Sequence, residues 1–184
     1  MTAEDFLAWP GDGSGRIFQL VDGEQRPVSP ASRTHSVVQA TLVRLIGNAI
    51  ESAGLALQVG AGMALQPPLN AGMNVRVPDV VVAPLADERG EIVAPDPVLV
   101  VEVLSPGNTD DTRDNIRSYA NLPSGREMAV IHSPRQRAEI HRREADGSWA
   151  ANPEIVEPGA HLRLATVALD IPLAQVYARS YLAR

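Results

Sequence analysis

The two most hydrophobic stretches of the chain read "VPDVVV" at 77–82 and "PVLVVEVLSP" at 97–106. Each has the composition of a buried strand, yet each contains one carboxylate, Asp79 in the first and Glu102 in the second. Burying an ionised carboxylate costs several kcal/mol unless it has a partner. Because neither stretch contains a basic residue, the reason for these two acids must lie elsewhere in the chain.

Pairing of the two stretches would bring the acids together. If they form neighbouring antiparallel strands, the start of the first lies against the end of the second, so that Asp79 meets Glu102. Side chains alternate along a strand, which puts Glu102 on one face with Val100 and Leu104, and Asp79 on one face with Val81. Adjacent carboxylates repel unless a proton or a cation lies between them. Oxygen ligands of this kind suit Mg²⁺ or Mn²⁺, and such an ion can activate water and stabilise charge on a phosphodiester.

The alternative is that these acids only end their strands, with Asp79 as a turn residue after Pro78. We favour a functional pair because Glu102 lies between two valines.

The rest of the chain predicts one α+β domain over 1–184, with a mixed, mainly antiparallel sheet flanked by three or four helices. A hairpin is expected within 16–28, around the turn signal Asp22-Gly23. A polar loop is expected at 84–96. Helices are predicted at 2–9, 36–52, 108–122 and 171–183. Thr2 caps the first and Thr109 is the N-cap of the third, whereas Pro172 lies near the first position of the last. The other predicted strands are 55–60, 63–67, 74–83, 97–104, 127–132 and 138–144.

Composition excludes several kinds of chemistry. The chain has 184 residues, 45% of them apolar, and a formal net charge of −6, which argues against a non-specific binder of polyanions. It contains no cysteine, so disulfides and thiolate metal sites are excluded. All 16 basic residues are arginine, so no step can use a lysine. No apolar run approaches the roughly 20 residues that span a bilayer, and we expect a cytoplasmic protein.

The two acidic strands, followed by an Asp-rich segment that ends in Tyr119, resemble the Uma-type putative restriction endonuclease family of the PD-(D/E)XK nuclease superfamily. The stretches "LVDGEQRPVSPASRTH" and "MAVIHSPRQRAEIHRREADGSW" extend this resemblance to about 15–180. It implies a restriction-endonuclease-like core and hydrolysis of DNA. It makes Asp79 and Glu102 ligands of Mg²⁺ or Mn²⁺, with the Val103 carbonyl as a third. DNA is the expected partner, and a homodimer is compatible with this interpretation.

Two further positions follow from the resemblance. Glu24 matches an acid that lies near the site in this family, although a solvated hairpin acid is an equal alternative. The superfamily's lysine normally lies two residues after the glutamate, where this chain has Leu104. In this family it commonly moves to the next helix, at the position of Asn115. Arg113 and Arg117 lie about 200° around a helix from Asn115, so neither replaces the lysine simply. In a working nuclease they are nevertheless the candidates for the cation near the phosphate, because the helix that carries them follows directly from the Glu102 strand.

The apolar residues of this helix predict which way Asn115 points. Ile116, Tyr119 and Leu122 define an inward face, and Asn115 borders it, so we expect Asn115 to face the site.

Other residues are weaker candidates. We interpret Ser105 as a turn residue rather than a nucleophile, and His35 as an exposed polar residue or a group that supports the site. His132 and His141 could approach each other across a hairpin, but we do not favour a metal site there. The arginines of 133–144 form the only cationic cluster, and a solvated strand face is favoured over contact with nucleic acid.

Three functions therefore compete. The intact acid pair favours a metal-dependent nuclease, whereas the missing lysine and acidic net charge favour an inactive nuclease fold that binds nucleic acid or a protein. A glycosidase with Asp79 and Glu102 as its acids is weaker, because aromatic residues make up only 4% of the chain.

Overall fold

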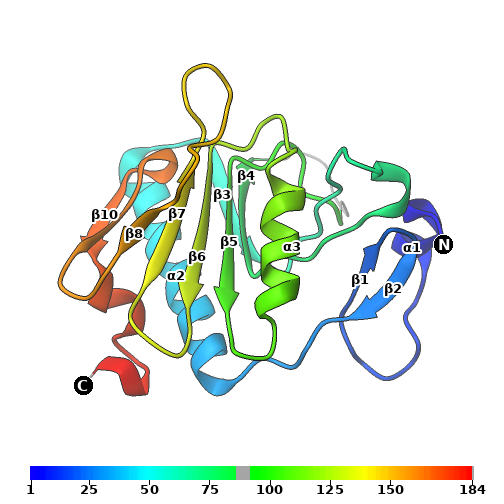
Figure 1. The fold of residues 1–184 in the computed structure, drawn as a ribbon, viewed down its shortest axis with the longest axis horizontal. Coiled ribbons are helices and arrows are strands. Elements are labelled where there is room, and N and C mark those ends of the chain that lie inside the picture. Colours follow the sequence, from blue (N-terminus) through cyan, green and yellow to red (C-terminus); the bar gives the residue numbers. More distant parts are fainter. Residues whose placement is uncertain (86–91, 184) are drawn as a thin grey trace.

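A six-stranded sheet forms the centre of the computed structural model, in the order β3-β4-β5-β6-β7-β8 (Figure 1). The structure describes residues 1–85 and 92–183, so the middle of the polar loop expected at 84–96, residues 86–91, lies outside the described residues. The strands are β3 (Leu57–Ala61), β4 (Val80–Pro84), β5 (Leu99–Leu104), β6 (Glu127–His132), β7 (Ala138–Arg142) and β8 (Glu154–Val156). Strands β5 and β6 are parallel, and the other neighbouring strands are antiparallel. The mixed, mainly antiparallel sheet of an α+β fold is therefore confirmed.

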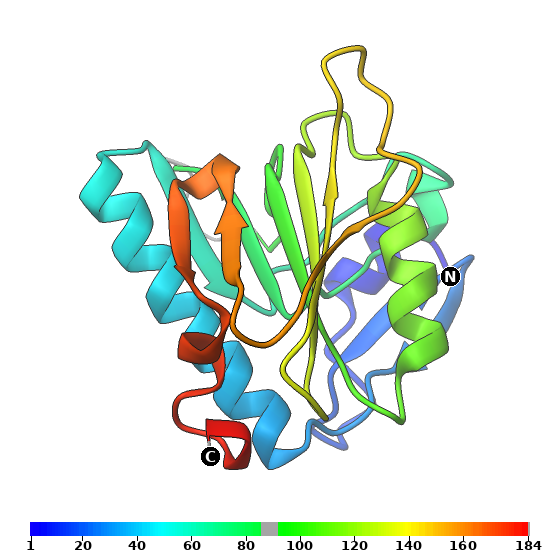
Figure 2. The same cartoon turned by 60° about the vertical axis from the view of Figure 1, so that its left-hand side comes forward.

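Two helices cover opposite faces of this sheet (Figures 1 and 2). Helix α2 (Arg33–Ala53) packs its apolar side on Val80 and Val82, whereas α3 (Thr109–Tyr119) packs on Val81. Alternation along the strands explains this division, because neighbouring residues point to opposite faces. Helix α3 also connects β5 to β6, since parallel strands need a crossover rather than a tight turn. Glu102 lies on the α3 face, as its spacing from Leu104 predicted.

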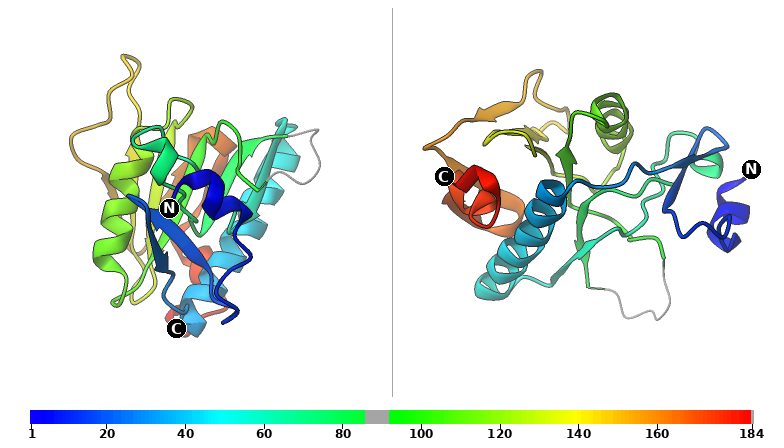
Figure 3. Two further views of the ribbon diagram at one scale, coloured as in Figure 1. Left: turned by 90° about the vertical axis from the view of Figure 1, so that its right-hand side faces the viewer. Right: turned by 90° about the horizontal axis from the view of Figure 1, so that it is seen from below.

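A small hairpin stands at one end of the molecule, beside the N-terminal helix (Figure 3). It consists of β1 (Phe18–Val21) and β2 (Glu24–Pro27), and α1 (Ala3–Ala8) packs nearby with the 3₁₀ turn η1 (Ala71–Met73). Asp22 and Gly23 both adopt positive φ, 49° and 83°, as the predicted Asp-Gly turn requires. A small apolar cluster joins this end to the rest of the fold, built from Ala3, Leu20, Ala64 and Val75.

Both predicted helices at the site begin differently from expectation. Helix α2 starts three residues early, because the Ser32 hydroxyl accepts a hydrogen bond from the His35 amide at 3.2 Å and caps it. The N-cap of α3 is Asn108 rather than Thr109, which is the first helical residue and donates its hydroxyl to the Ser105 carbonyl. The helix ends at Tyr119, and Leu122 follows in a turn.

Two strand predictions need correction. Of the segment 74–83, only Val80 onward joins the sheet, because Val75 and Arg76 form isolated bridges with Leu20 and Leu65. The segment 63–67 forms only such isolated bridges and no strand of its own.

The closing helix predicted at 171–183 is wrong. Its start belongs to β10 (Leu169–Pro172), which pairs with β9 (His161–Leu164), two short strands that the sequence did not reveal. The remainder forms the 3₁₀ turns η3 (Leu173–Tyr177) and η4 (Tyr181–Ala183). The apolar side chains of η3 are buried within a single turn, and the Tyr177 hydroxyl bonds to backbone groups beside β6, so an α-helix is not needed to bury this segment.

None of the helices in the described parts of the chain combines the length and apolar character needed to cross a membrane.

Candidate active site

Asp79 and Glu102 are opposite one another where β4 meets β5. The antiparallel register pairs Val80 with Val101, so the next position places Asp79 against Glu102. The Asp79 Oδ2 accepts a hydrogen bond of 2.7 Å from the amide of Val103, on the neighbouring strand. The predicted antiparallel pairing of the two acidic strands is therefore confirmed.

Helix α2 holds Asp79 from the other side. The ring Nε2 of His35 lies 2.7 Å from Asp79 Oδ1, and the Gln39 amide donates to the Asp79 carbonyl at 2.8 Å. His35 is buried, and its Nδ1 is 3.3 Å from the Ser105 hydroxyl. Of the two interpretations of His35, the structure therefore supports the group that orients the site, because both Asp79 oxygens have a fixed donor.

Glu102 is held by α3. Its Oε1 accepts hydrogen bonds from the Tyr119 hydroxyl at 2.9 Å and from the Asn115 side-chain amide at 3.1 Å. All three residues are buried. The expectation that Asn115 faces the two acids is confirmed, since it lies beside Ile116 and Tyr119 on the side of α3 that packs on the sheet.

Burial raises the pKa of the Glu102 carboxyl well above its ordinary value, and the neighbouring Asp79 carboxylate raises it further. The hydrogen bonds from Tyr119 and Asn115 act in the opposite direction without cancelling this effect. Burial, together with the Glu102 charge, likewise raises the pKa of the Tyr119 hydroxyl well above 10. In the absence of a cation, Glu102 therefore keeps its proton to a higher pH than an ordinary glutamate does.

A buried arginine that sequence reasoning missed stands directly behind Asn115. One guanidinium nitrogen of Arg76 donates to Asn115 Oδ1 at 3.2 Å, and another donates to Asn74 Oδ1 at 3.2 Å. The two arginines that the sequence offered lie elsewhere: Arg113 forms an ion pair with Glu139, and the exposed Arg117 pairs with Asp114. Arg76 comes only three residues before Asp79, but nothing in that spacing indicates that tertiary contacts bury it.

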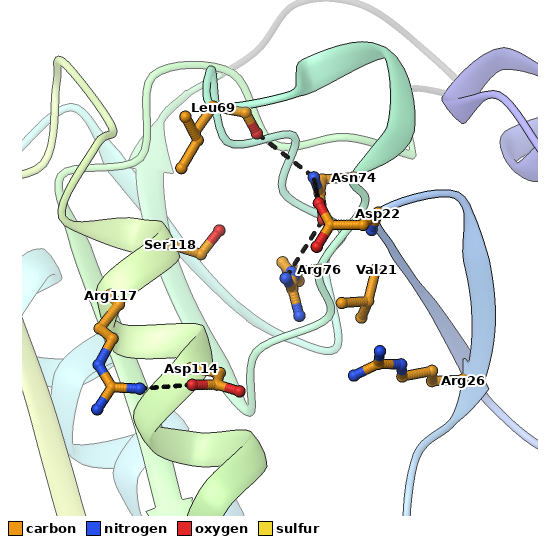
Figure 4. Close-up of a pocket in the computed structure, with 9 residues that line it drawn as sticks. All are labelled: Val21, Asp22, Arg26, Leu69, Asn74, Arg76, Asp114, Arg117 and Ser118. Carbon is orange, nitrogen blue, oxygen red and sulfur yellow. Dashed lines mark hydrogen bonds and ion pairs between the residues drawn. The ribbon is translucent and has the colours of Figure 1, made fainter.

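A pocket of about 310 Å³ opens between α3 and the β1–β2 hairpin, with Arg76 inside it (Figure 4). The lining comes from three segments that are far apart in the sequence: Val21, Asp22 and Arg26; Leu69, Asn74 and Arg76; and Asp114, Arg117 and Ser118. The Asn115 amide connects this pocket to Glu102.

The oxygen ligands available at Asp79 and Glu102 suit a hard divalent cation. Within the residues that the structure describes, no group of three or more acidic, histidine or cysteine side chains could hold a metal ion. The available set is two carboxylates and strand carbonyls such as that of Val103, which accepts a long bond of 3.4 Å from Asn108. Mg²⁺ commonly binds through one or two carboxylates and keeps several waters, so this small set suits it.

Glu24 lies at the start of β2, with its side chain exposed and paired with Arg26. Among the contacts of the described residues, it has no hydrogen bond to Asp79 or Glu102.

The weaker candidates fall into structural contacts. Ser105 lies between His35 and the Ser133 hydroxyl, which is 2.9 Å away. His132 bonds to Glu139 at 2.8 Å, whereas His141 is opposite Met128 in the β6–β7 register.

The arginines of 133–144 are largely occupied by protein partners. Arg137 pairs with Glu157, Arg142 pairs with Glu127 and Glu154, and Arg143 donates to the carbonyls of three residues after α3.

Comparison with known proteins supports the resemblance noted from the sequence. A family model described as "Uma2: Putative restriction endonuclease" matches residues 3–174. A solved structure from Anabaena variabilis, described as a putative nuclease belonging to DUF820, superposes with a TM-score of 0.74 at 19% identity. The superposition covers 97% of this chain and 98% of that one, so the two share a fold. No match was found among curated proteins.

Proposed function

The chain belongs to the Uma2 putative restriction endonuclease family, and from this premise we propose that it is a metal-dependent nuclease that hydrolyses DNA phosphodiester bonds. Asp79 and Glu102 are the proposed catalytic acids, with Mg²⁺ or Mn²⁺ as the cofactor.

The observation that carries this proposal is the environment of Glu102. It is a buried carboxylate next to a second carboxylate, and no arginine or histidine among the described residues forms an ion pair with it. Such an arrangement is unfavourable for folding unless a cation or a proton is supplied. Two acids that destabilise the fold in the absence of a cation are expected where the residues are kept for function rather than for folding.

The residues that would hold the ion are the Asp79 and Glu102 carboxylates and the Val103 carbonyl. When bound, a divalent cation supplies a more acidic water and stabilises negative charge on a phosphate. The protein's own groups then have separate tasks. His35 and the Val103 amide fix the orientation of Asp79, while Tyr119 and Asn115 fix that of Glu102. In the overall reaction, water adds to phosphorus, one P–O ester bond breaks and the departing oxygen takes a proton.

A second candidate is a module that binds nucleic acid or a protein and no longer cuts. The specific observation in its favour is Asn115, a neutral amide that contacts Glu102 at the position where the family commonly has lysine. The assignments of Glu24 as a site residue, of a homodimer and of a cytoplasmic location remain parts of the proposal that need their own tests.

Cleavage of supercoiled plasmid in Mn²⁺ tests the proposal. We expect slow nicking by the wild type, abolished by EDTA and by Asp79→Asn or Glu102→Gln. Loss of a direct metal ligand should lower the nicking rate more than loss of a residue that only orients a ligand, which typically lowers affinity or activity by about 10- to 100-fold. Glu139→Gln, which changes another buried acid, should nick like the wild type once the fraction folded is matched. Cleavage that persists in Asp79→Asn and Glu102→Gln would exclude these acids as the site.

A further inference from the structure

The Arg76 pocket contains a buried cation whose charge has no carboxylate partner among the residues that the structure describes. Arg76 is only 7% exposed, and its guanidinium donates to the neutral side chains of Asn74 and Asn115. Its Nε has no hydrogen-bond partner, and in the described parts of the chain no carboxylate lies within ion-pair distance of it. Buried charges are normally paired, so a guanidinium in this state is poised for an anion from outside.

Acids do line the pocket, but both have other partners. Asp22 accepts hydrogen bonds from Asn74 at 3.1 Å and from Asn70 at 3.3 Å. Asp114 pairs with Arg117 at 2.6 Å. Neither carboxylate therefore neutralises Arg76 directly.

The geometry around Arg76 suits an anion with several oxygens. Figure 4 shows its side chain entering the pocket between α3 and the hairpin, with Arg26 and Arg117 on the flanks. Both flanking arginines are held only by exposed ion pairs, which contribute little and exchange easily. A guanidinium offers a planar set of donors that matches the oxygens of a phosphate. The volume of about 310 Å³ is at the small end of ligand pockets.

We infer that this pocket binds a backbone phosphate of the nucleic acid, with Arg76 as the residue that contacts it. This inference rests on the proposed function, because it identifies the bound strand as the substrate of the site at Glu102. Asn115 joins the two places: its Oδ1 accepts from Arg76, and its Nδ2 donates to Glu102. A phosphate on Arg76 would therefore lie one side chain away from the acid pair.

The inference also explains how the chain manages without lysine. The family commonly carries a lysine at the Asn115 position, whereas here the positive charge is supplied by Arg76 from the segment before Asp79. Arginine cannot act as a base, so Arg76 binds and positions phosphate rather than moving a proton. Its loss should therefore weaken DNA binding and raise KM more than it lowers kcat.

Binding in EDTA tests this assignment separately from cleavage. The probes are a fluorescent duplex, followed by anisotropy, and inorganic phosphate, followed by thermal shift. We expect Arg76→Gln to weaken duplex binding at least about tenfold, to reduce its salt dependence by the equivalent of about one phosphate contact and to abolish the thermal shift. The duplex affinity of Arg76→Lys should lie between those of wild type and Arg76→Gln, because lysine keeps the charge but lacks the planar donors. Arg44→Gln changes the net charge equally on the exposed side of α2 and should stay within about twofold of wild type.

A second variant keeps the test decisive if Arg76→Gln does not fold. Ser118→Asp adds a carboxylate to the pocket lining, on a half-buried position of α3, and leaves Arg76 in place. It should also weaken duplex binding about tenfold, whereas Asn48→Asp on exposed α2 should not.

The outcomes separate this inference from the proposed function. Loss of binding in the pocket variants of a protein that never cuts DNA would support the inference and exclude the nuclease activity. If the protein cuts DNA and both pocket variants keep the wild-type affinity and kcat/KM, the inference is overturned and the proposed function stands. Arg76-dependent binding of inorganic phosphate without any duplex binding would overturn the assignment to nucleic acid, and so would the absence of binding to both probes.

Discussion

Two buried glutamates in one cross-strand row of the sheet have opposite environments. Glu102 of β5 is opposite Val130 of β6, and Val130 is opposite Glu139 of β7, so both acids lie under α3. Glu139 accepts two hydrogen bonds from Arg113, at 2.6 and 2.9 Å, and a third from His132. Glu102 has a tyrosine, an amide and a second acid around it, and no cation within the described ranges 1–85 and 92–183 pairs with it.

The difference appears directly in their acidity. Arg113 lowers the pKa of Glu139 to about 2, with His132 helping, whereas burial and Asp79 raise the pKa of Glu102 well above its ordinary value. Burial lowers the pKa of the His132 imidazole, although its hydrogen bond to Glu139 acts in the opposite direction. A carboxylate that has cationic partners contributes to folding, and one that lacks them is available to an external cation. Burial alone does not distinguish the two; their partners do.

The largest expected effect is on the paired acid. Glu139→Gln should lower the free energy of unfolding by about 2 to 3 kcal/mol at pH 7, because Arg113 loses a partly buried bidentate partner. Between pH 2 and 4.5 the unfolded state binds more protons at this position than the folded state does, so stability from Glu139 rises with pH over that window. Urea unfolding from pH 2 to 7 measures both quantities. A variant as stable as wild type, with an unchanged acid limb, would show that the pair contributes nothing.

Glu102→Gln should have the opposite sign. We expect the metal-free variant to be as stable as wild type or up to about 2 kcal/mol more stable at pH 7. Above pH 4.5 the folded state retains a proton on Glu102 that the unfolded chain has released, so the wild type loses stability as pH rises through the raised pKa. This dependence of the free energy of unfolding on pH should disappear in Glu102→Gln. The same urea series decides the matter, and a loss above about 2 kcal/mol would place Glu102 with Glu139 as a structural acid.

A smaller effect is expected from giving Glu102 a cation. Asn115→Lys introduces the lysine that the sequence resemblance leads us to expect there, and it should raise Mn²⁺-dependent plasmid nicking about tenfold, the equivalent of about 1.4 kcal/mol. Asn115→Gln is the matched neutral control. Nicking that rises equally in both variants would indicate an effect of side-chain length, and vigorous wild-type nicking would mean that the lysine is not needed.

The paired strands and the orientation of α3 could be predicted because local patterns determine them. The apolar runs 80–82 and 99–103 are typical of strands buried on both faces, and Ile116 and Tyr119 fix which side of α3 faces the sheet. These patterns were enough to bring Asp79, Glu102 and Asn115 together.

The remaining features depend on contacts between distant segments. Arg76 is held in its buried position by a backbone bridge to Leu65 and by the side-chain Oδ1 of Asn115, and His35 by its contact with Asp79, 44 positions away in the sequence. The helix predicted at 171–183 was wrong for a similar reason, because Pro172 pairs with His161, a contact that helical spacing cannot reveal.

The central claim is that Asp79 and Glu102 are retained to bind a divalent cation, and calorimetric titration with Mn²⁺ tests it most directly. The account predicts one ion bound by the wild type, with release of a proton from Glu102, detected by repeating the titration in buffers of different ionisation enthalpy. Asp79→Asn and Glu102→Gln should lose binding, and Glu139→Gln should keep it. Equal Mn²⁺ binding by wild type and Glu102→Gln, or no binding by the wild type, would contradict the claim.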